Sequence, residues 1–284
     1  MEKVGELWFT EKPRGGSGFS MRIDEVLFHG KSDFQSAMVF RNSEYGNVML
    51  LDDSIMITDR DEFVYHEMLA HVPLMSHPSP KKVLVIGAGD GGTVREICRH
   101  KRVEKVDWVE IDKLVIELGE RYFPAVSAAN KDPRVNIMVQ DGIEYVKNTK
   151  EKYDVILVDS TDPVGPGVVL FSEEFYGSCK RLLNEGGILV PQTESPFFHQ
   201  DIISHIYATL RKVFAVVMPY TVTVVTYPSG IWSFGYATAG RRPDDYFADE
   251  EYSRFSDKLK YYTRDIQRGA FCVPAYVKRL TGAA

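Results

Sequence analysis

The chain has 284 residues, of which 44% are hydrophobic and 26% charged, and its net charge is -6. This composition is typical of a globular protein with one main domain and a smaller one, and the acidic balance argues against nucleic acid as the main partner. Three widely spaced cysteines fit neither a disulfide framework nor a paired-cysteine metal site. Because the N-terminus is charged and no long apolar stretch is present, we expect a cytoplasmic protein without a membrane partner.

Residues 1–60 are expected to form a small N-terminal β-domain. This part of the chain is rich in β-branched and aromatic residues that alternate with polar ones. The expected strands are Phe19–Phe28, Phe34–Phe40 and the two arms of a hairpin, Asn47–Asp59, that turns at Asp52–Asp53.

Residues 61–284 predict a doubly wound α/β domain. Its first helix is expected over Asp61–Met75, with Phe63, Met68 and Leu69 among the core positions. From Lys81 onward short apolar runs alternate with helical patterns, which indicates a parallel sheet with helices on both faces. The expected strands are Val83–Ile86, Lys105–Glu110, Val135–Val139, Asp154–Val158 and Ile188–Gln192, with helices near Thr93–His100, Lys113–Tyr122, Ile143–Thr149 and Glu173–Leu183, and an antiparallel edge from Phe214–Met218 and Ile231–Ala237.

The stretch Lys81–Gly92 (KKVLVIGAGDGG) predicts a ligand-binding loop between the first of these strands and the next helix. Gly87, Gly89 and Gly92 have the G-x-G-x-x-G spacing that lets a ligand approach the backbone at a helix N-terminus. Asp90 lies in this loop, where a carboxylate would repel an anion and attract a cation. The alternative interpretation is that Asp90 merely caps the helix.

An acidic residue follows or ends each of the first four strands of this domain: Asp90, Glu110, Asp141 and Asp159. Glu110 lies about 20 residues after the glycine loop, the spacing at which an acid binds ribose hydroxyls. Asp141–Gly142 would bind an adenine edge. Asp90, Asp159 and Asp162 would then form a negative pocket, which favours a sulfonium nucleoside and an amine over NAD.

Several segments together resemble the spermidine synthases, a family of polyamine aminopropyltransferases. The resemblance extends from ELWFTEK near the N-terminus to FCVPAYV near the C-terminus, and it includes the runs DRDEFVYHEML, GAGDGG, VEID, QDG, DSTDPVGP and TYPSG. It implies a small β-domain followed by a Rossmann-like, class I methyltransferase-like domain. The implied reaction transfers an aminopropyl group from decarboxylated S-adenosylmethionine, a co-substrate, to putrescine, without a further cofactor or metal, and leaves methylthioadenosine.

The resemblance also implies roles for particular residues. Asp90 would bind the amino end of the aminopropyl group, and Asp159 would be the catalytic base. The implied nucleoside site comprises Gln35, Glu110, Asp141, Gly142 and Pro166. The implied amine site comprises Tyr65, His66, Ser160, Thr161, Asp162 and Tyr227 beside Asp90 and Asp159. A homodimer or homotetramer is implied as well, and an exposed N-terminal hairpin would suit such an interface.

The chain departs from the family pattern at two turns. Asp53 occupies the glycine of the usual L-D-G turn, and Ala88 occupies the middle glycine of the usual G-G-G-D-G-G loop; we expect both to be tolerated. The residues before TYPSG, Thr223–Val225, also differ from the common pattern. The run Ser160–Leu170 is expected to close over the donor, or else to be a plain strand–helix connection.

The chemistry of the implied reaction assigns work to two of the acids. Putrescine has lysine-like amines with pKa values of about 10, so the nucleophile arrives protonated and Asp159 would remove the proton. Burial and like-charged neighbours should raise the pKa of Asp159 toward that task. Asp90 would discriminate between donors, because the carboxylate of ordinary S-adenosylmethionine would lie against it.

Other patterns are better explained by structure. His66 and His71 are spaced too far apart for the metalloprotease motif and should face different sides of the helix, and Ser160 lacks a catalytic histidine. Without the resemblance, His66 and Tyr65 would be interpreted as packing residues. Phe197–Phe198 would be core or interface, and Asp201 would cap the next helix.

Rival functions remain at this point. The glycine spacing and Glu110 also fit an NAD-dependent oxidoreductase, against which Asp90 argues. A methyltransferase acting on putrescine would use ordinary S-adenosylmethionine, and a polyamine or nucleoside sensor would bind without turnover. Acceptors other than putrescine, namely cadaverine, agmatine or spermidine, would be distinguished by residues near Met56, Tyr227 and Trp232.

Overall fold

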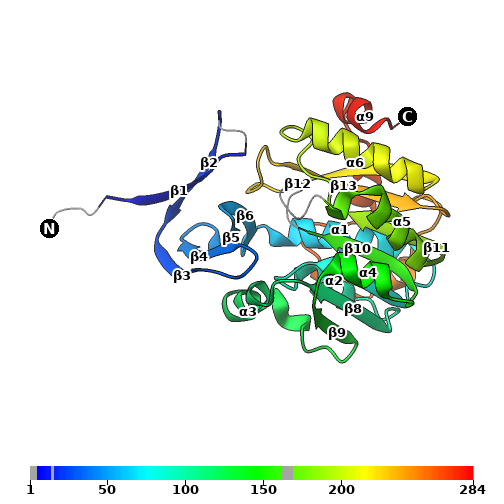
Figure 1. Ribbon diagram of the computed structural model, residues 1–284, viewed down its shortest axis with the longest axis horizontal. Helices are drawn as coiled ribbons and strands as arrows, with labels where there is room; N and C mark the ends of the chain where they lie inside the picture. Colours follow the sequence, from blue (N-terminus) through cyan, green and yellow to red (C-terminus); the bar gives the residue numbers. More distant parts are fainter. Residues whose placement is uncertain (1–4, 14–15, 161–168, 284) are drawn as a thin grey trace.

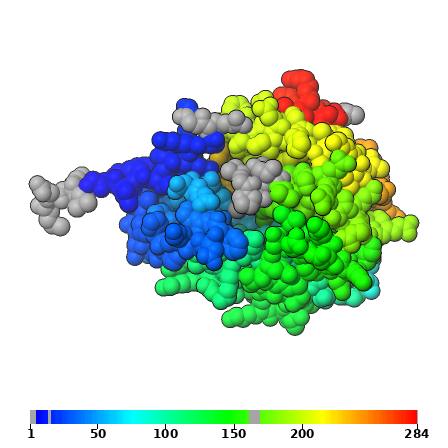
Figure 2. All heavy atoms as spheres, viewed as in Figure 1, coloured from blue at the N-terminus to red at the C-terminus, as the bar shows by residue number. Residues whose placement is uncertain are grey.

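The computed structural model describes residues 5–13, 16–160 and 169–283, which form an N-terminal β-region and a larger α/β domain (Figure 1). Two sheets make up the β-region. The first pairs β1 (Leu7–Glu11) with β2 (Phe19–Ile23), and this hairpin, in dark blue, projects from the body of the molecule (Figure 2). The second is an antiparallel four-stranded sheet of β3 (Glu25–Lys31), β4 (Ser36–Asn42), β5 (Gly46–Leu51) and β6 (Ser54–Thr58).

The predicted turn at Asp52–Asp53 joins β5 to β6 and is confirmed. Both aspartates have left-handed backbones, with φ of 45° and 61°. A two-residue hairpin turn of this kind favours Asn-Gly or Asp-Gly, because glycine enters the left-handed region without steric cost. Asp52 compensates through its side chain, whose Oδ1 accepts hydrogen bonds from the backbone N–H of Ser36 at 2.8 Å and its hydroxyl at 2.9 Å.

The α/β domain is built on a seven-stranded sheet with the order β12-β13-β11-β10-β7-β8-β9. The strands from β11 to β9 run parallel, whereas β13 is antiparallel to both β11 and β12, as the sequence predicts. The strands are β7 (Lys82–Gly87), β8 (Lys105–Glu110), β9 (Val135–Val139), β10 (Tyr153–Asp159), β11 (Leu183–Pro191), β12 (Val216–Thr223) and β13 (Ile231–Thr238).

Alternate residues of the central strands enter two different cores. Val83 and Val85 of β7 pack in the core that contains α1 (Glu62–Ser76) and α2 (Gly92–Cys98), whereas Leu84 and Ile86 pack in the core on the opposite face. Because side chains alternate along a strand, an unbroken apolar run indicates burial on both faces. The second core is completed by α4 (Gly142–Asn148), α5 (Glu173–Leu182) and α6 (Gln200–Val213).

Helix α3 (Lys113–Tyr122) joins the β-region to the α/β domain. Asp112 caps its N-terminus by accepting the Leu114 N–H at 3.0 Å, and Val115 and Leu118 pack in a core with Met49 of β5. The β-region is thus fixed beside the carboxyl ends of β7 and β8, where it forms one wall of the cavity described below.

Several elements differ from the prediction. The strand expected from Ile188 begins at Leu183, because Leu183 pairs with Tyr153 across a register shift. Asp201 does not cap α6: the helix begins one residue earlier, after His199, and Asp201 lies in its first turn. Phe63 is only half-buried, and Phe197 is 59% exposed and therefore not a core residue. Strand β1 and the short helices α7 (Asp249–Ser253), α8 (Arg264–Ala270) and α9 (Ala275–Thr281) were not predicted individually.

Candidate active site

A cavity of about 730 Å³ lies where the carboxyl ends of β7 and β10 meet. These neighbouring strands continue to opposite sides of the sheet, so they form the switch point at which doubly wound folds bind ligands. Gly87 and Asp159 are directly paired in the sheet. A Cβ on Gly87 would lie 2.0 Å from the Asp159 carbonyl oxygen, so this approach requires glycine.

The four predicted strand-end acids, Asp90, Glu110, Asp141 and Asp159, all line this cavity. Ala88 lies beside them with a left-handed backbone (φ 62°), and its N–H donates to the Asp159 carbonyl oxygen at 2.9 Å. The alanine that replaces the usual glycine is therefore accommodated, although it adopts a backbone conformation that is rare for residues other than glycine.

Asp159 is held by two hydroxyl groups. The Tyr65 hydroxyl donates to its Oδ1 at 2.7 Å, and the Thr93 hydroxyl donates to its Oδ2 at 2.6 Å. Burial, followed by the charge of Asp90, raises the pKa of Asp159 above its usual value, which is the direction predicted from the sequence. A carboxylate so placed is a stronger base than one in water.

Asp90 is not the N-cap residue of α2, which is Gly91, but its side chain contacts both the first residue of that helix and His66. Its Oδ1 accepts the Gly92 N–H at 2.6 Å and lies 3.3 Å from His66 Nε2. Burial opposes its ionisation, but the charge and hydrogen bond of His66 outweigh this and lower the pKa of Asp90. The cavity therefore contains one firmly ionised carboxylate, Asp90, beside a more basic one, Asp159.

Glu110, Asp141, Gly142 and Gln35 lie together on the side of the cavity near β8 and β9. Glu110 is 8% exposed, and burial raises its pKa to about 7 although its Oε1 accepts the Asp112 N–H at 2.8 Å. The Asp141 Oδ1 caps α4 by accepting the Ile143 N–H at 2.7 Å. Gln35 Nε2 donates to Asp112 Oδ2 at 2.9 Å, which fixes the amide at the cavity wall.

Aromatic residues form another part of the wall. Tyr65 packs against Tyr227 with ring centroids 5.8 Å apart, and Tyr227 packs against Trp232 at 4.8 Å. The Tyr227 hydroxyl donates to the Met56 carbonyl oxygen at 2.8 Å, which links this wall to the β-region. Tyr65 is therefore a packing residue with a polar contact to Asp159.

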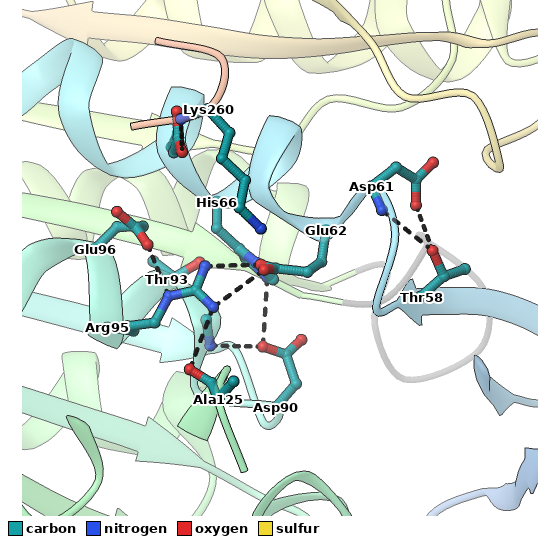
Figure 3. A network of polar contacts seen from close by, with 12 residues as sticks. Thr58, Asp61, Glu62, His66, Asp90, Thr93, Arg95, Glu96, Ala125 and Lys260 are labelled. Carbon is teal, nitrogen blue, oxygen red and sulfur yellow. Dashed lines mark hydrogen bonds and ion pairs between the residues drawn. The ribbon is translucent and has the colours of Figure 1, made fainter. Parts of the chain in front are cut away.

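His66 is buried, and each of its ring nitrogens faces a carboxylate. The residue is therefore part of a polar network and not only a packing residue. Its Nδ1 donates to Glu62 Oε2 at 2.6 Å, and its Nε2 faces Asp90 (Figure 3). Burial alone would lower the pKa of His66, but Asp90 and Glu62 raise it to about 10, so the imidazole is charged at neutral pH. His71 faces Glu96 and His100 instead, as expected from the helical spacing. The described residues contain no cluster of metal-ligating side chains.

Some predicted residues cannot be placed in this way. Thr161, Asp162 and Pro166 lie outside the described residues, as does most of the run Ser160–Leu170. Ser160 lines the cavity, and its carbonyl oxygen accepts from Gln192 Nε2 at 3.2 Å.

Three polar residues of the site were not predicted from the sequence: Thr93, Glu62 and Arg95. Thr93 directly follows the last glycine of the loop, a position that faces the ligand end of the sheet. Glu62 precedes His66 by four residues, a spacing that places both on one helix face. Arg95 comes from a different helix and binds Glu62 Oε2 through Nη2 at 2.8 Å. No local sequence pattern predicts this contact, because the two residues are far apart in the chain.

No helix among the described residues is long and apolar enough to cross a membrane. Residues 7–59 match the spermidine synthase tetramerisation domain, and residues 62–244 match the spermine/spermidine synthase domain. The chain is 45% identical to a polyamine aminopropyltransferase of Clostridium perfringens over 97% of this chain and 98% of that one. It is 42% identical to a polyamine aminopropyltransferase of Bacillus subtilis over 98% of this chain and 99% of that one.

Solved structures agree with these matches. A crystal structure of a spermidine synthase in complex with the transition state analogue AdoDATO superposes with a TM-score of 0.94 at 42% identity, covering 98% of this chain and 96% of that one. The spermidine synthase from Thermotoga maritima gives a TM-score of 0.91 at 40% identity, covering 98% and 95%. The chain belongs to the spermidine synthase family of polyamine aminopropyltransferases.

Proposed function

We propose that this aminopropyltransferase transfers the aminopropyl group of decarboxylated S-adenosylmethionine to putrescine, forming spermidine and methylthioadenosine. The observation that carries the proposal is the pair of carboxylates Asp90 and Asp159 in one cavity. Asp90 is kept ionised beside the N-terminus of α2, and its negative charge would repel an anionic group of a ligand. Asp159, with its raised pKa, is suited to remove a proton.

The nucleoside of the donor is assigned to the side of the cavity near β8 and β9. Glu110 ends β8 and would bind the ribose hydroxyls, as acids do at this position of a nucleotide-binding fold. Asp141 and Gly142 would bind the adenine edge, with Gln35 beside them. A Cβ on Gly142 would lie 2.6 Å from Ile86 Cγ2, so glycine keeps the strand end open to a flat ring. Pro166 belongs to the same proposed site but lies outside the described residues.

The amine is assigned to the aromatic side of the cavity. Tyr65 and Tyr227 would position the diamine, with His66 and Ser160 nearby and Thr161 and Asp162, outside the described residues, as further contacts. Asp159 would accept one proton from the attacking ammonium. The free amine nitrogen then forms a bond to the aminopropyl carbon while the carbon–sulfur bond breaks, and the sulfur keeps the electron pair as a neutral thioether.

Little more than placement is required of the protein for this step. The sulfonium sulfur of the donor is already a good leaving group, because it departs as a neutral thioether. The rate gain therefore comes from aligning nitrogen, carbon and sulfur and from supplying the base. The spermidine synthase that superposes on this chain was crystallised with a transition state analogue, which supports assigning the same cavity to the reacting groups here.

We also propose that the protein works as a homo-oligomer. Residues 7–59 match a tetramerisation domain, and the projecting β1–β2 hairpin exposes Leu7 and Trp8, which are 57% and 53% exposed. Exposed apolar residues on a strand pair favour association with another chain.

Mass spectrometry of reaction mixtures tests the function. The purified protein is incubated with putrescine and either decarboxylated or ordinary S-adenosylmethionine. We expect methylthioadenosine and spermidine with the decarboxylated donor alone. Methylated putrescine with the ordinary donor would make the protein a methyltransferase, and transfer to cadaverine, agmatine or spermidine in preference to putrescine would change the acceptor.

The variant Asp159→Asn separates catalysis from binding. It keeps the size of the side chain and its hydrogen bond from Tyr65 or Thr93, but it cannot take a proton. We expect kcat to fall by about 10²–10⁴, the usual contribution of a general base, while donor affinity measured by calorimetry changes only a few-fold. Equal loss of binding and turnover would contradict the assignment of Asp159 as base.

A further inference from the structure

We propose that Glu62 and Arg95 are positioning residues that act through His66 to hold Asp90 ionised and oriented, so that its Oδ2 is presented to the donor's ammonium group. This inference rests on the proposed function for the identity of the ammonium group. The chain of contacts itself does not depend on that function.

The four side chains alternate in charge along one continuous path. Arg95 Nη2 donates to Glu62 Oε2 at 2.8 Å and its Nη1 donates to Glu62 Oε1 at 3.1 Å, a two-point clamp. Glu62 Oε2 accepts from His66 Nδ1 at 2.6 Å, and His66 Nε2 lies 3.3 Å from Asp90 Oδ1 (Figure 3). The two arms of the clamp fix the plane of the carboxylate, which a single lysine contact would not do.

The path of contacts leads from helices α1 and α2 to the wall of the cavity. Glu62 and His66 lie one turn apart on α1, Arg95 lies on α2, and Asp90 lies in the loop that precedes α2. The side chains of Glu62 and His66 are 5% and 4% exposed, whereas that of Asp90 is 14% exposed and lines the cavity. Glu62 and Arg95 therefore lie behind the cavity wall, whereas His66 and Asp90 line the cavity itself.

The His66 ring has little freedom to turn. A Cβ on Gly92 would lie 2.3 Å from the Nδ1 and Cε1 atoms of the ring, so the imidazole packs directly on the backbone of α2. The Tyr65 ring packs edge-on to the imidazole, with centroids 5.6 Å apart. Glu62 then fixes the orientation of the ring, because it accepts the hydrogen bond of Nδ1–H and leaves Nε2–H to face Asp90.

Among the described residues, the hydrogen bonds and ion pairs of Asp90 are confined to one of its oxygens. Oδ1 accepts from Gly92 and faces His66, while Oδ2 points away from the network (Figure 3). An anchored Oδ1 leaves Oδ2 as the acceptor for a cation that enters the cavity. His66 also keeps Asp90 ionised: burial would otherwise favour the neutral acid, which would bind an ammonium group far less well.

Arg95 helps to keep Glu62 ionised. Glu62 is buried, and without a cation it would share a proton with the imidazole; the pKa of Glu62 is instead lowered by His66 and Arg95 against the effect of burial. The charged or titratable groups around His66 are Glu62 and Tyr65 on its own helix, Asp90 in the glycine loop, Arg95 on α2 and Asp159 at the end of β10.

The test compares Glu62→Gln and Arg95→Gln with the matched control Arg99→Gln. Arg99 is the C-cap residue of the same helix and binds Glu96 but not Glu62. Glu96 keeps its other cation, Arg95 Nε at 2.7 Å, so this variant loses an ion pair while the contacts along the path stay in place. We expect KM for the donor to rise about tenfold or more in the first two variants, with a smaller change in kcat and in KM for the amine. Arg95→Lys should restore part of the loss, and Arg99→Gln should match the wild type.

The pH dependence gives a readout that a general loss of packing would not produce. In the wild type His66 stays charged below its pKa of about 10, so it should add no pH dependence to KM for the donor from about pH 6 to 9; Glu110, whose pKa is raised to about 7, is the group of the proposed donor site that titrates in this range. In Glu62→Gln the imidazole loses its proton nearer the ordinary histidine value of about 6.5, so KM relative to that of the wild type should rise with pH over the same range. A ratio of the two KM values that does not change with pH would overturn the proposal.

NMR titration of the His66 imidazole tests the effect of Glu62 on its pKa without any substrate. We expect the ring in Glu62→Gln to lose its proton at a lower pH than in the wild type, and the ring in Arg99→Gln to be unchanged. An unchanged His66 titration in Glu62→Gln would overturn the inference even if the enzyme is active. Failure of the wild type to use the decarboxylated donor, with the NMR shift present, would instead overturn the proposed function.

Discussion

Asp90 and Asp159 are two carboxylates of one cavity whose surroundings move their pKa values in opposite directions. Against the effect of burial, His66 and the Gly92 N–H lower the pKa of Asp90, whereas burial and the charge of Asp90 raise that of Asp159. A pair of acids separated in this way can divide the work between charge recognition and proton transfer. At the scale of the residue, this difference supports the proposed use of a cationic donor and a protonated amine.

Thr93 gives the sharpest residue-scale prediction, because its hydroxyl stabilises the ionised form of Asp159. Thr93→Val removes that hydrogen bond and should raise the pKa of Asp159 further. A base works only when deprotonated, so kcat/KM falls as pH falls through this pKa. We therefore expect the acid limb of the pH–rate profile to move to higher pH in Thr93→Val. In the control Thr93→Ser, which keeps the hydroxyl, the limb should stay in place; an unmoved limb in the valine variant would show that Asp159 is not the group that titrates.

The turn between β5 and β6 is the element in which local sequence and conformation disagree. Asp53 is exposed and left-handed, and no hydrogen bond of its side chain is observed among the described residues, whereas left-handed Asp52 bonds to Ser36. The four-stranded sheet nevertheless keeps its pairing through Leu51 and Ser54. The hairpin therefore tolerates this sequence because the flanking strands determine the turn.

Asp53→Gly should stabilise the protein by about 0.5–1 kcal/mol, because glycine adopts the left-handed conformation without steric cost. Asp52→Gly should destabilise it, because the gain in backbone freedom does not replace two hydrogen bonds to Ser36, each contributing about 1 kcal/mol. Denaturant unfolding of both variants beside the wild type measures the difference. Equal effects of the two substitutions would contradict this account of the turn.

Sequence patterns predicted the elements of the α/β domain better than its contacts. The run Val83–Ile86 indicated burial on both faces, and the two cores on either side of β7 confirm it. The early start of β11 was not predictable, because polar and glycine residues at 184–187 look like a turn until Leu183 pairs with Tyr153. Arg95 was missed for the same reason: its partner Glu62 is 33 residues away in the chain.

At the scale of the whole molecule, the β-region and the α/β domain share one cavity. Met49 and Met56 of the β-region line it together with the loop after β7, and α3 packs against β5 to hold the two regions in register. The β1–β2 hairpin projects from this body (Figures 1 and 2). Its residue Trp8 is exposed. Thr10 and Glu11 of the same hairpin line the cavity, so the proposed surface of association adjoins one wall of the proposed site.

Trp8→Glu tests the proposed surface of association. A charge on the exposed hairpin should weaken association between copies, because a like charge is placed on each partner of a symmetric interface. We expect a smaller mass in solution by light scattering, with the far-UV spectrum unchanged. Retention of the wild-type mass would place the interface elsewhere, and a monomeric wild type would contradict the proposed oligomer.

The central claim is that Asp90 selects a donor with an ammonium group and no carboxylate. Calorimetry with decarboxylated and ordinary S-adenosylmethionine, on the wild type and on Asp90→Asn, tests it most directly. Asparagine keeps an oxygen for the Gly92 N–H but removes the charge. We predict that the wild type prefers the decarboxylated donor by about 100-fold, equivalent to about 2.7 kcal/mol, and that Asp90→Asn loses at least about tenfold of this preference. The same preference in both proteins would contradict the assignment of Asp90 as the selecting residue.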